Sequence, residues 1–474
     1  MKFGRTSIVN FLSQVVMSFS GFFGTVVLTR ILGREQYGGY VVVMSVLAWA
    51  TIAGNLGIST AVRKRVSEET EGNYVVAGFL SQSFLYVLVA VFLLTIRPHL
   101  NSYMGFEGTR FLIALLAARL LFNLVNGVLD GQHLVHISSV LRPIQMTSQT
   151  IVQVALVVSG FGLAGAFAGY FVGTIVAVTI GLYFASVRLK SPSKTAFHRL
   201  RTYAQFSWFA SIQTQTFLSM DTIILAFFVT NSVIGGYKAA WNLVTIFAMF
   251  STSIRRTLFP EISKLASQEG SNAEVSRLLR EGLTYSGLFI IPGITGSAIL
   301  GDVVLSIYGE GFAAGYYILL ILGVAQLLYG YQSQFVNVID GVNRPDITFR
   351  INALFVLLNF LLNIILTPQF GWYGAAFSTT VSAGIGALLG FYYARSVTNI
   401  TIPFSEIGRQ VAAAGLMTVV VLPGRLLIGR SLVGVVVLSG IGAGVYFISL
   451  LLLSEKFRST VQHNLPFPIS GLEQ

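Results

Sequence analysis

The sequence predicts an all-α polytopic membrane protein with about 14 transmembrane helices. We expect two six-helix lobes in a parallel pseudo-twofold repeat, followed by two further C-terminal helices. The first observation is composition: the 474 residues are 54% hydrophobic and 10% charged, whereas soluble domains carry roughly 25% charged residues. The second is that apolar runs of roughly 20 residues, long enough to cross a bilayer, recur along the chain. The third is that short motifs recur in the same order in both halves.

Composition also limits the chemistry. The chain has no cysteine and five histidines, so thiolate metal sites and disulfides are excluded and neither a metal nor a cofactor is expected. The formal net charge is +12, which could suggest nucleic acid. The basic residues lie mostly in short connections between apolar runs, however, so they indicate membrane topology and no nucleic-acid partner.

The first apolar run follows Lys2 and Arg5 and extends over 8–29. It is longer than the 7–15 residues of a signal-peptide core, so it predicts a retained first helix. The remaining predicted spans are 39–62, 76–96, 111–130, 138–159, 162–186, 206–228, 232–254, 282–301, 316–338, 349–367, 372–393, 408–424 and 431–453.

The basic residues predict the orientation of these spans. If the N-terminus is cytoplasmic, the inner connections and inner span ends hold 22 of the 30 Lys and Arg residues, and the outer ones hold 6. This bias follows the positive-inside rule. We therefore expect a multi-pass protein of the cell membrane with both termini in the cytoplasm.

Three pairs of motifs indicate the repeat. They are Gly38-Gly39-Tyr40 with Gly235-Gly236-Tyr237, Asp130-Gly131 with Asp340-Gly341, and Phe161-Gly162 with Phe370-Gly371, at offsets of 197, 210 and 209 residues. Six spans in each half give both halves the same orientation, a common transporter plan. The predicted parts are an N-terminal lobe at 1–186, a basic cytoplasmic linker at 187–202, a C-terminal lobe at 203–394, and two further helices with a cytoplasmic tail at 395–474.

The chain resembles a known family at several of these motifs. The stretch Thr29-Arg30-Ile-Leu-Gly33-Arg-Glu-Gln-Tyr37-Gly38-Gly-Tyr40 is similar to the first turn region of the polysaccharide and oligosaccharide (O-antigen type) flippases of the multidrug/oligosaccharidyl-lipid/polysaccharide exporter superfamily. Phe259-Pro260-Glu261 and the loop from Asp340 to Asp346 continue the resemblance, which covers about residues 5–395. It implies transbilayer movement of a lipid-linked oligosaccharide, with membrane lipids and glycan-assembly enzymes as further partners. It implies no catalytic residue.

The fourth span carries a polar stripe. Arg119, Asn123, Asn126 and Asp130 follow one another at spacings of 4, 3 and 4, which place them on one helical face. The stripe predicts an aqueous cavity in which Arg119 attracts a phosphate or pyrophosphate, because the guanidinium fork holds phosphate oxygens bidentately. In the alternative, Arg119 snorkels or pairs within the bundle and the Asn side chains bond between helices.

Asp221 is an acid inside the predicted seventh span, where a charge is costly and therefore suggests function. It could bind a proton or sodium ion, balance a cation such as Arg119 or Lys238, or mark the family structurally. The residue 197 positions earlier is Gly24, so the acid belongs to one lobe only. This asymmetry favours a charge partner that shapes the cavity.

Four more polar residues are candidates for the substrate pathway. Gln213 and Asn242, together with Gln215, could contact sugar hydroxyls or pack between helices. Lys238 could bind substrate or reach lipid headgroups.

The leading hypothesis is therefore a flippase that moves a polyprenyl- or dolichyl-(pyro)phosphate-linked oligosaccharide to the outer leaflet by alternating access. One alternative is a cation-coupled exporter of drugs or metabolites from the same superfamily. Another is a membrane glycan polymerase or ligase, which would need a catalytic outer segment. The outer loop between Arg97 and Arg110 has only about fourteen residues, little room for such a segment.

Overall fold

The computed structural model describes residues 2–68, 73–187, 191–266, 268, 272–428 and 431–464, and all regular structure within these ranges is helical. Eleven helical segments in this part of the chain are long and apolar enough to cross a membrane. The prediction of an all-α membrane protein is thereby confirmed.

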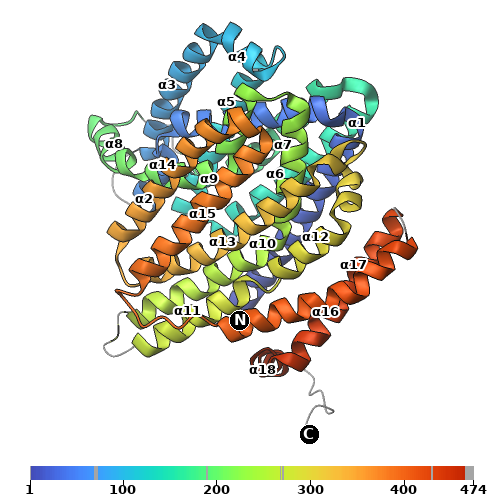
Figure 1. The fold of residues 1–474 in the computed structure, drawn as a ribbon. Helices are drawn as coiled ribbons and strands as arrows, with labels where there is room; N and C mark the ends of the chain where they lie inside the picture. Colours follow the sequence, from blue (N-terminus) through green and yellow to red (C-terminus); the bar gives the residue numbers. More distant parts are fainter. Residues whose placement is uncertain are drawn as a thin grey trace. The chain divides into compact units, whose positions relative to one another are not determined.

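The chain forms two compact units. The first comprises Met1–Gly236 with Tyr308–Glu310, and the second comprises Tyr237–Ile307 with Gly311–Gln474. The helices of the first unit, labelled in Figure 1, are α1 (Lys2–Asn55), α2 (Ile58–Ser67), α3 (Tyr74–Thr95), α4 (Arg97–Met104), α5 (Thr109–Gly131), α6 (Val135–Leu156), α7 (Gly162–Phe184), α8 (Lys194–Ser207) and α9 (Phe209–Phe228).

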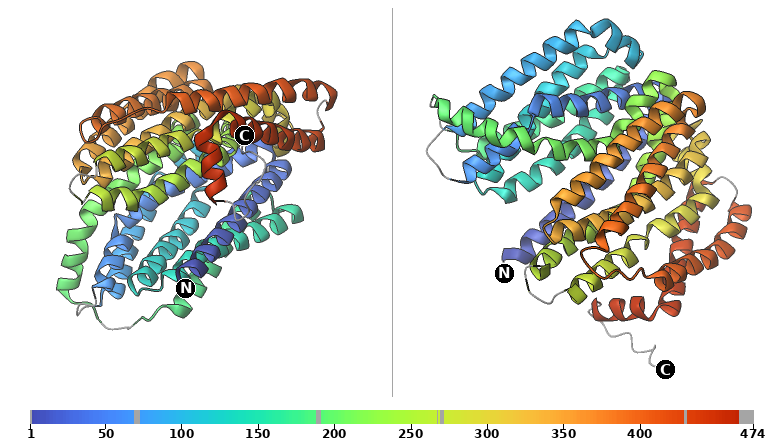
Figure 2. Two further views of the ribbon diagram at one scale, coloured as in Figure 1. Left: turned by 90° about the horizontal axis from the view of Figure 1, so that it is seen from below. Right: turned by 60° about the vertical axis from the view of Figure 1, so that its left-hand side comes forward.

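The second unit begins in the first turns of α10. Its helices are α10 (Asn231–Ala266), α11 (Asn272–Ser286), α12 (Ile290–Leu305), α13 (Tyr316–Gly341), α14 (Pro345–Phe370), α15 (Trp372–Ala394), α16 (Phe404–Ile428), α17 (Leu432–Leu453) and α18 (Glu455–Asn464). Within this unit α14 and α15 lie side by side, as do α16 and α17 (Figure 2).

Four of the apolar segments have 36 residues or more, which is longer than a single crossing needs, and two of these four contain a glycine break. Ser20–Asn55 has 36 residues and Val135–Phe184 has 50, and a helix of 20 residues already spans about 30 Å. Each contains a break where glycine takes a left-handed φ: Gly33 at 68° in α1, and Gly160 at 90° between α6 and α7. These two segments are therefore interrupted helices.

The paired motifs of the two halves share local backbone structure. Gly162 has φ 53° and ψ −136°, and Gly371 has φ 56° and ψ −133°, a region that residues with a Cβ avoid. His133 and Asn343, each three residues after a motif aspartate, both have φ 60°. The amide of the residue after each of them bonds to the carbonyl five positions back, at 2.9 Å from Leu134 and 3.0 Å from Arg344. Both helices thus end in the same Schellman turn.

Glycines in α7 bring α6 close. A Cβ added at Gly169 would lie 2.5 Å from the amide nitrogen of Gln153, and one at Gly173 would lie 2.5 Å from that of Gln149. Small residues four apart allow membrane helices to approach at backbone distance. This contact fixes the rotation of α6 and hence the direction of its polar face.

The predicted linker at 187–202 is partly helical. Helix α8 covers Lys194–Ser207, and its Ala196, Leu200 and Ala204 are buried in a cluster with residues of α2, α3 and α5. Helix α9 belongs to the first compact unit, whereas the predicted C-terminal lobe begins at residue 203. The lobe limits describe a sequence repeat and remain predictions.

Candidate functional site

The first unit contains a cavity of about 730 Å³. Its lining side chains come from α1, α5, α6, α7 and α9, and are Met44, Leu47, Ala48, Thr51, Ile52, Arg119, Arg142, Gln145, Met146, Gln149, Tyr170, Thr214 and Gln215. Two of these are cationic, and none of the described lining residues is acidic. The volume lies within the usual range of ligand pockets, about 300–1,000 Å³.

The two arginines give the cavity its charge. Arg119 lies on α5 and is half-buried, and its Nη1 donates to the hydroxyl of Tyr170 on α7 at 3.2 Å. Arg142 lies on α6 and is exposed, directly before Pro143, which is inside the helix. The guanidinium groups thus reach one cavity from different helices, and the Tyr170 bond holds one of them in place.

Amides and hydroxyls supply neutral polar groups. Gln145 is 2% exposed and its Nε2 donates to Thr174 at 3.0 Å. The Nε2 of Gln149 donates to Gln153 at 3.3 Å, and Gln153 in turn donates to the carbonyl of Ala166 at 2.7 Å. These bonds tie the polar face of α6 to α7, so its glutamines are held in fixed orientations beside the arginines.

Helix α9 contributes Thr214 and Gln215 to the lining. The amide of Gln215 also donates to Ser219 on the same helix. Asp221 lies six residues beyond Gln215, about 9 Å along the helix axis, and is 5% exposed. The side chain of Gln213 lies outside the described residues.

Of the four residues in the predicted polar stripe on α5, the described cavity lining includes one. Arg119 lines the cavity, whereas the described lining does not include Asn123, Asn126 or Asp130. Asn126 donates to the carbonyl of Phe122 in its own helix at 2.9 Å, and Asp130 accepts from the hydroxyl of Ser138. Asn123 is half-buried.

Lys238 and Asn242 belong to the second unit. Both are half-buried and lie one turn apart on α10. The Nζ of Lys238 lies 5.9 Å from the centre of the Trp241 ring, within range of a cation–π contact.

Sequence reasoning did not select Arg142, Gln145 or Gln149 as site residues. In the sequence they interrupt the fifth predicted span and weaken its apolar signal. Their spacings of 3 and 4 place them on one helical face, so the same positions could have been interpreted as a second polar stripe. A polar face on an otherwise apolar helix is the signal that would have found them.

This arrangement suits an anion that carries hydroxyl groups. Guanidinium groups hold phosphate oxygens bidentately, and glutamine, threonine and tyrosine side chains can donate to and accept from hydroxyls. Within the part of the chain that the structure describes, no group of three or more His, Asp or Glu could hold a metal ion.

Comparisons with known proteins find flippases among the relatives of this chain. The chain is 30% identical over 473 residues to the probable flippase AglR of Haloferax volcanii, covering 98% of each chain. It is 27% identical to the probable low-salt glycan biosynthesis flippase Agl15 of the same organism, covering 98% of this chain and 99% of that one. The solved structure of the lipid II flippase MurJ, in an inward closed conformation, shares the fold with a TM-score of 0.78 at 15% identity, covering 96% of this chain and 100% of that one.

A family profile described as polysaccharide biosynthesis protein matches residues 3–266, more than half of the chain. This match agrees with the resemblance inferred from the motifs around Gly33–Tyr40, and the predicted family is thereby confirmed. The chain belongs to the polysaccharide biosynthesis protein family.

Proposed function

We propose that the protein is a flippase that moves a polyprenyl- or dolichyl-(pyro)phosphate-linked oligosaccharide from the cytoplasmic to the outer leaflet, for surface glycan or glycoprotein assembly. The observation that carries the proposal is a cavity whose described lining combines Arg119 and Arg142 with neutral polar side chains. The flippase relatives support the same activity. The protein is thus a transporter and not an enzyme.

Different side chains of the cavity would bind the phosphate and the sugar parts of the substrate. The arginines would hold the phosphate or pyrophosphate, and Gln145, Gln149 and Gln215 would bond to the first sugars. The lipid tail would remain in the bilayer, because its transfer to a polar cavity would lose hydrophobic stabilisation of about 0.8 kcal/mol per CH₂.

Alternating access requires many crossings and two similar lobes. We propose fourteen crossings: the interrupted segments Ser20–Asn55 and Val135–Phe184 each supply two, and the shorter apolar helix Thr214–Phe228 supplies another. The matching turns at Gly162 and Gly371 support a parallel repeat of six spans. The positive-inside bias supports cytoplasmic termini.

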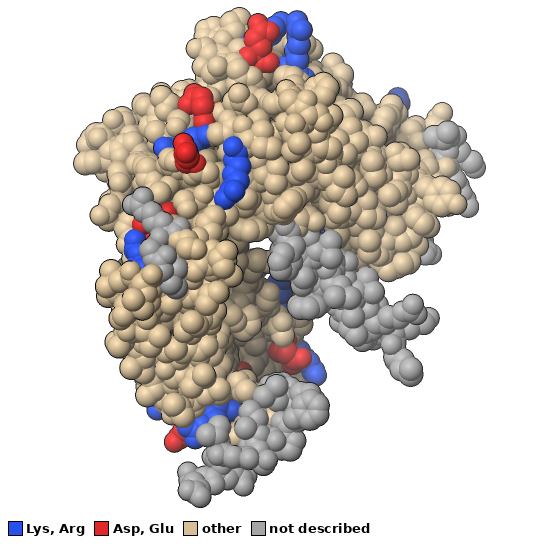
Figure 3. Space-filling view, turned by 90° about the vertical axis from the view of Figure 1, so that its right-hand side faces the viewer, with Lys and Arg blue, Asp and Glu red and all other residues tan. Residues whose placement is uncertain are grey.

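The surface is compatible with a bilayer. On the face shown in Figure 3, Lys, Arg, Asp and Glu form small separate groups and most of the surface is uncharged. Large exposed apolar side chains such as Phe84, Val91 and Phe92 of α3 are 65%, 56% and 60% exposed, as expected where lipid and not water is the solvent.

The direct test is reconstitution. The purified protein would be placed in liposomes containing a fluorescent lipid-linked oligosaccharide, and a membrane-impermeant reagent would report which leaflet holds it. We expect the accessible fraction to rise from about half to nearly all of the label. If correctly folded protein leaves half of the label protected, the proposal is wrong.

Replacing Asp221 with asparagine tests the cation-coupled alternative. A buried charge must be balanced, and we propose that Asp221 balances a cation. The variant should lower the thermal midpoint by several degrees, since breaking a buried pair costs about 3–5 kcal/mol. Flipping per folded molecule should stay within about threefold of the parent, because no step of the proposed cycle uses this carboxylate. Loss of flipping together with loss of its dependence on a proton or sodium gradient would instead support ion coupling.

A further inference from the structure

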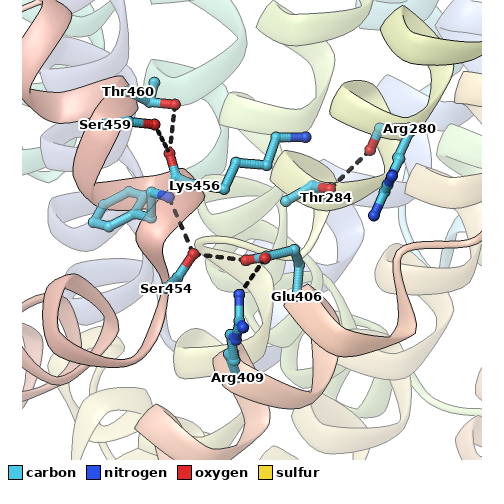
Figure 4. A network of polar contacts seen from close by, with 9 residues as sticks. Arg280, Thr284, Glu406, Arg409, Ser454, Lys456, Ser459 and Thr460 are labelled. Carbon is cyan, nitrogen blue, oxygen red and sulfur yellow. Dashed lines mark hydrogen bonds and ion pairs between the residues drawn. The ribbon is translucent and has the colours of Figure 1, made fainter.

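A polar cluster joins α11, α16 and α18 in the second unit (Figure 4). The hydroxyl of Ser454, between α17 and α18, donates to Glu406 of α16 at 2.6 Å and accepts from the amide of Phe457 at 3.0 Å. On the other side, the hydroxyl of Tyr285 on α11 lies 2.7 Å from that of Thr460 on α18. Helix α18 therefore has a definite position against both neighbours.

The two carboxylates of the cluster already have partners. Glu406 is 7% exposed and lies 2.5 Å from Nη1 of Arg409. Glu281 lies 3.2 Å from Nη1 of Arg277. Each acid is therefore balanced by a basic residue on its own helix.

Two cations remain. Lys456 of α18 extends toward α11, where Arg280 and Thr284 lie (Figure 4). Among the described residues, neither Lys456 nor Arg280 has an ion pair. The cluster thus has two cations more than its carboxylates balance.

Lys456 is partly buried and lies near charges of both signs. Burial lowers the pKa of Lys456 below its usual range, Glu281 and Glu406 oppose this shift, and Arg280 and Arg277 add to it. An anion bound between Lys456 and Arg280 would reverse the unfavourable contribution of the neighbouring cations. The ammonium group is therefore placed where a phosphate would stabilise it.

Apolar side chains lie beside Lys456. Leu288, Leu450 and Phe457 line the small pocket that also contains Lys456 and Glu406. Leu452 and Leu453, at the end of α17, are 63% and 40% exposed, and Phe289 is 39% exposed. A site with cations on one side and exposed hydrocarbon on the other matches a phospholipid better than a free anion.

We propose that Lys456 and Arg280 bind the headgroup phosphate of an anionic phospholipid of the cytoplasmic leaflet, with its acyl chains against the end of α17. The leaflet assignment rests on the orientation given under the proposed function. A lipid bound here would bridge α11 and α18, and so would stabilise the packing of the C-terminal helices within the second unit.

The test measures lipid binding to the purified full chain in detergent. Phosphatidylglycerol, phosphatidylcholine and inorganic phosphate would be titrated separately, with native mass spectrometry counting bound lipid and tryptophan fluorescence following the thermal midpoint. We expect phosphatidylglycerol to raise the midpoint by several degrees and the other two to leave it within about one degree. An equal response to inorganic phosphate would indicate a free-anion site and overturn the lipid proposal.

Substitutions of Lys456 and Arg280 test whether these two residues bind the lipid. Lys456→Gln and Arg280→Gln should each weaken phosphatidylglycerol binding about fivefold, since one basic residue near an anionic surface contributes about 1 kcal/mol. Lys456→Arg keeps the charge and should bind within about twofold of the parent, and provides the readout if Lys456→Gln fails to fold. Arg350→Gln, which removes an exposed charge from α14 of the same unit, is the matched control and should bind as the parent does.

If Lys456→Gln and Arg280→Gln bind phosphatidylglycerol as tightly as Arg350→Gln does, the proposed site is wrong. That result would leave the flippase proposal intact, because binding is measured without transport. Conversely, a chain that binds the lipid but leaves labelled oligosaccharide in place would contradict only the flippase.

Discussion

Replacing Arg119 and Arg142 together with glutamine is expected to reduce flipping of a lipid-linked oligosaccharide by at least about 100-fold. A hydrogen bond to a charged group contributes about 1.5–3 kcal/mol, which corresponds to roughly 10–150-fold in binding for each arginine. Both guanidinium groups line the same cavity, so each single variant should lose about tenfold or more. The measurement is the initial rate of label movement in liposomes at equal amounts of folded protein.

Three further variants separate charge, geometry and folding. Arg119→Lys keeps the charge but loses the planar fork, so it should recover only part of the activity. Tyr170→Phe removes the 3.2 Å bond to Arg119 but leaves the guanidinium, so its effect should be smaller than that of Arg119→Gln. Arg110→Gln removes an exposed charge from the start of the same helix and should behave as the parent. Equal rates for Arg110→Gln and the double variant would contradict a role for the cavity arginines.

Replacing Gly38 with alanine is expected to destabilise the first unit by about 3 kcal/mol or more, at the upper end of the range for overpacking. A Cβ at this position would lie 1.8 Å from the carbonyl oxygen of Asn231, and backbone cannot move aside as a side chain can. Gly235 makes the reciprocal contact, because a Cβ added there would lie 2.4 Å from the carbonyl oxygen of Arg34. The two contacts are related by the sequence repeat, because Gly235 follows Gly38, and Asn231 follows Arg34, at the same offset of 197 residues.

The measurement is thermal unfolding in detergent, followed through the four tryptophans. Gly415→Ala in α16 is the control, because a Cβ there would meet nothing within 4 Å. That variant should be neutral or up to about 1 kcal/mol more stable, since alanine favours a helix over glycine. If Gly38→Ala unfolds at the temperature of Gly415→Ala, the close contact between α1 and α10 does not contribute to stability.

The repeat could be recognised in the sequence because its motifs contain residues that a particular backbone conformation requires. Gly162 and Gly371 occupy a region of φ and ψ that a Cβ excludes, so the residue type itself identifies the turn. His133 and Asn343 show the limit of this reasoning. Both have φ 60° although neither is glycine. In the sequence they are related only because each follows its motif aspartate, Asp130 or Asp340, by three residues.

The cavity was only partly predictable. Arg119 was identified because the other polar residues of α5 share its helical face, but Asn126 bonds to its own backbone instead. In the sequence Arg142 and Gln149 only interrupt an apolar span, because a single helix does not reveal what its polar face contacts. The approach of α7, through Gly169 and Gly173, decides which face of α6 turns toward Arg119.

The sequence by itself determined the class of protein, the all-α membrane architecture and the family. In a bilayer each backbone amide must be bonded within its own segment, so a long apolar run can only be a helix. The tertiary structure alone decided that Arg119 and Arg142, from different helices, line one cavity, and that Asp221 is buried in α9. Those facts depend on the relative rotation of packed helices, which close side-chain contacts determine and the apolar pattern of a single span does not.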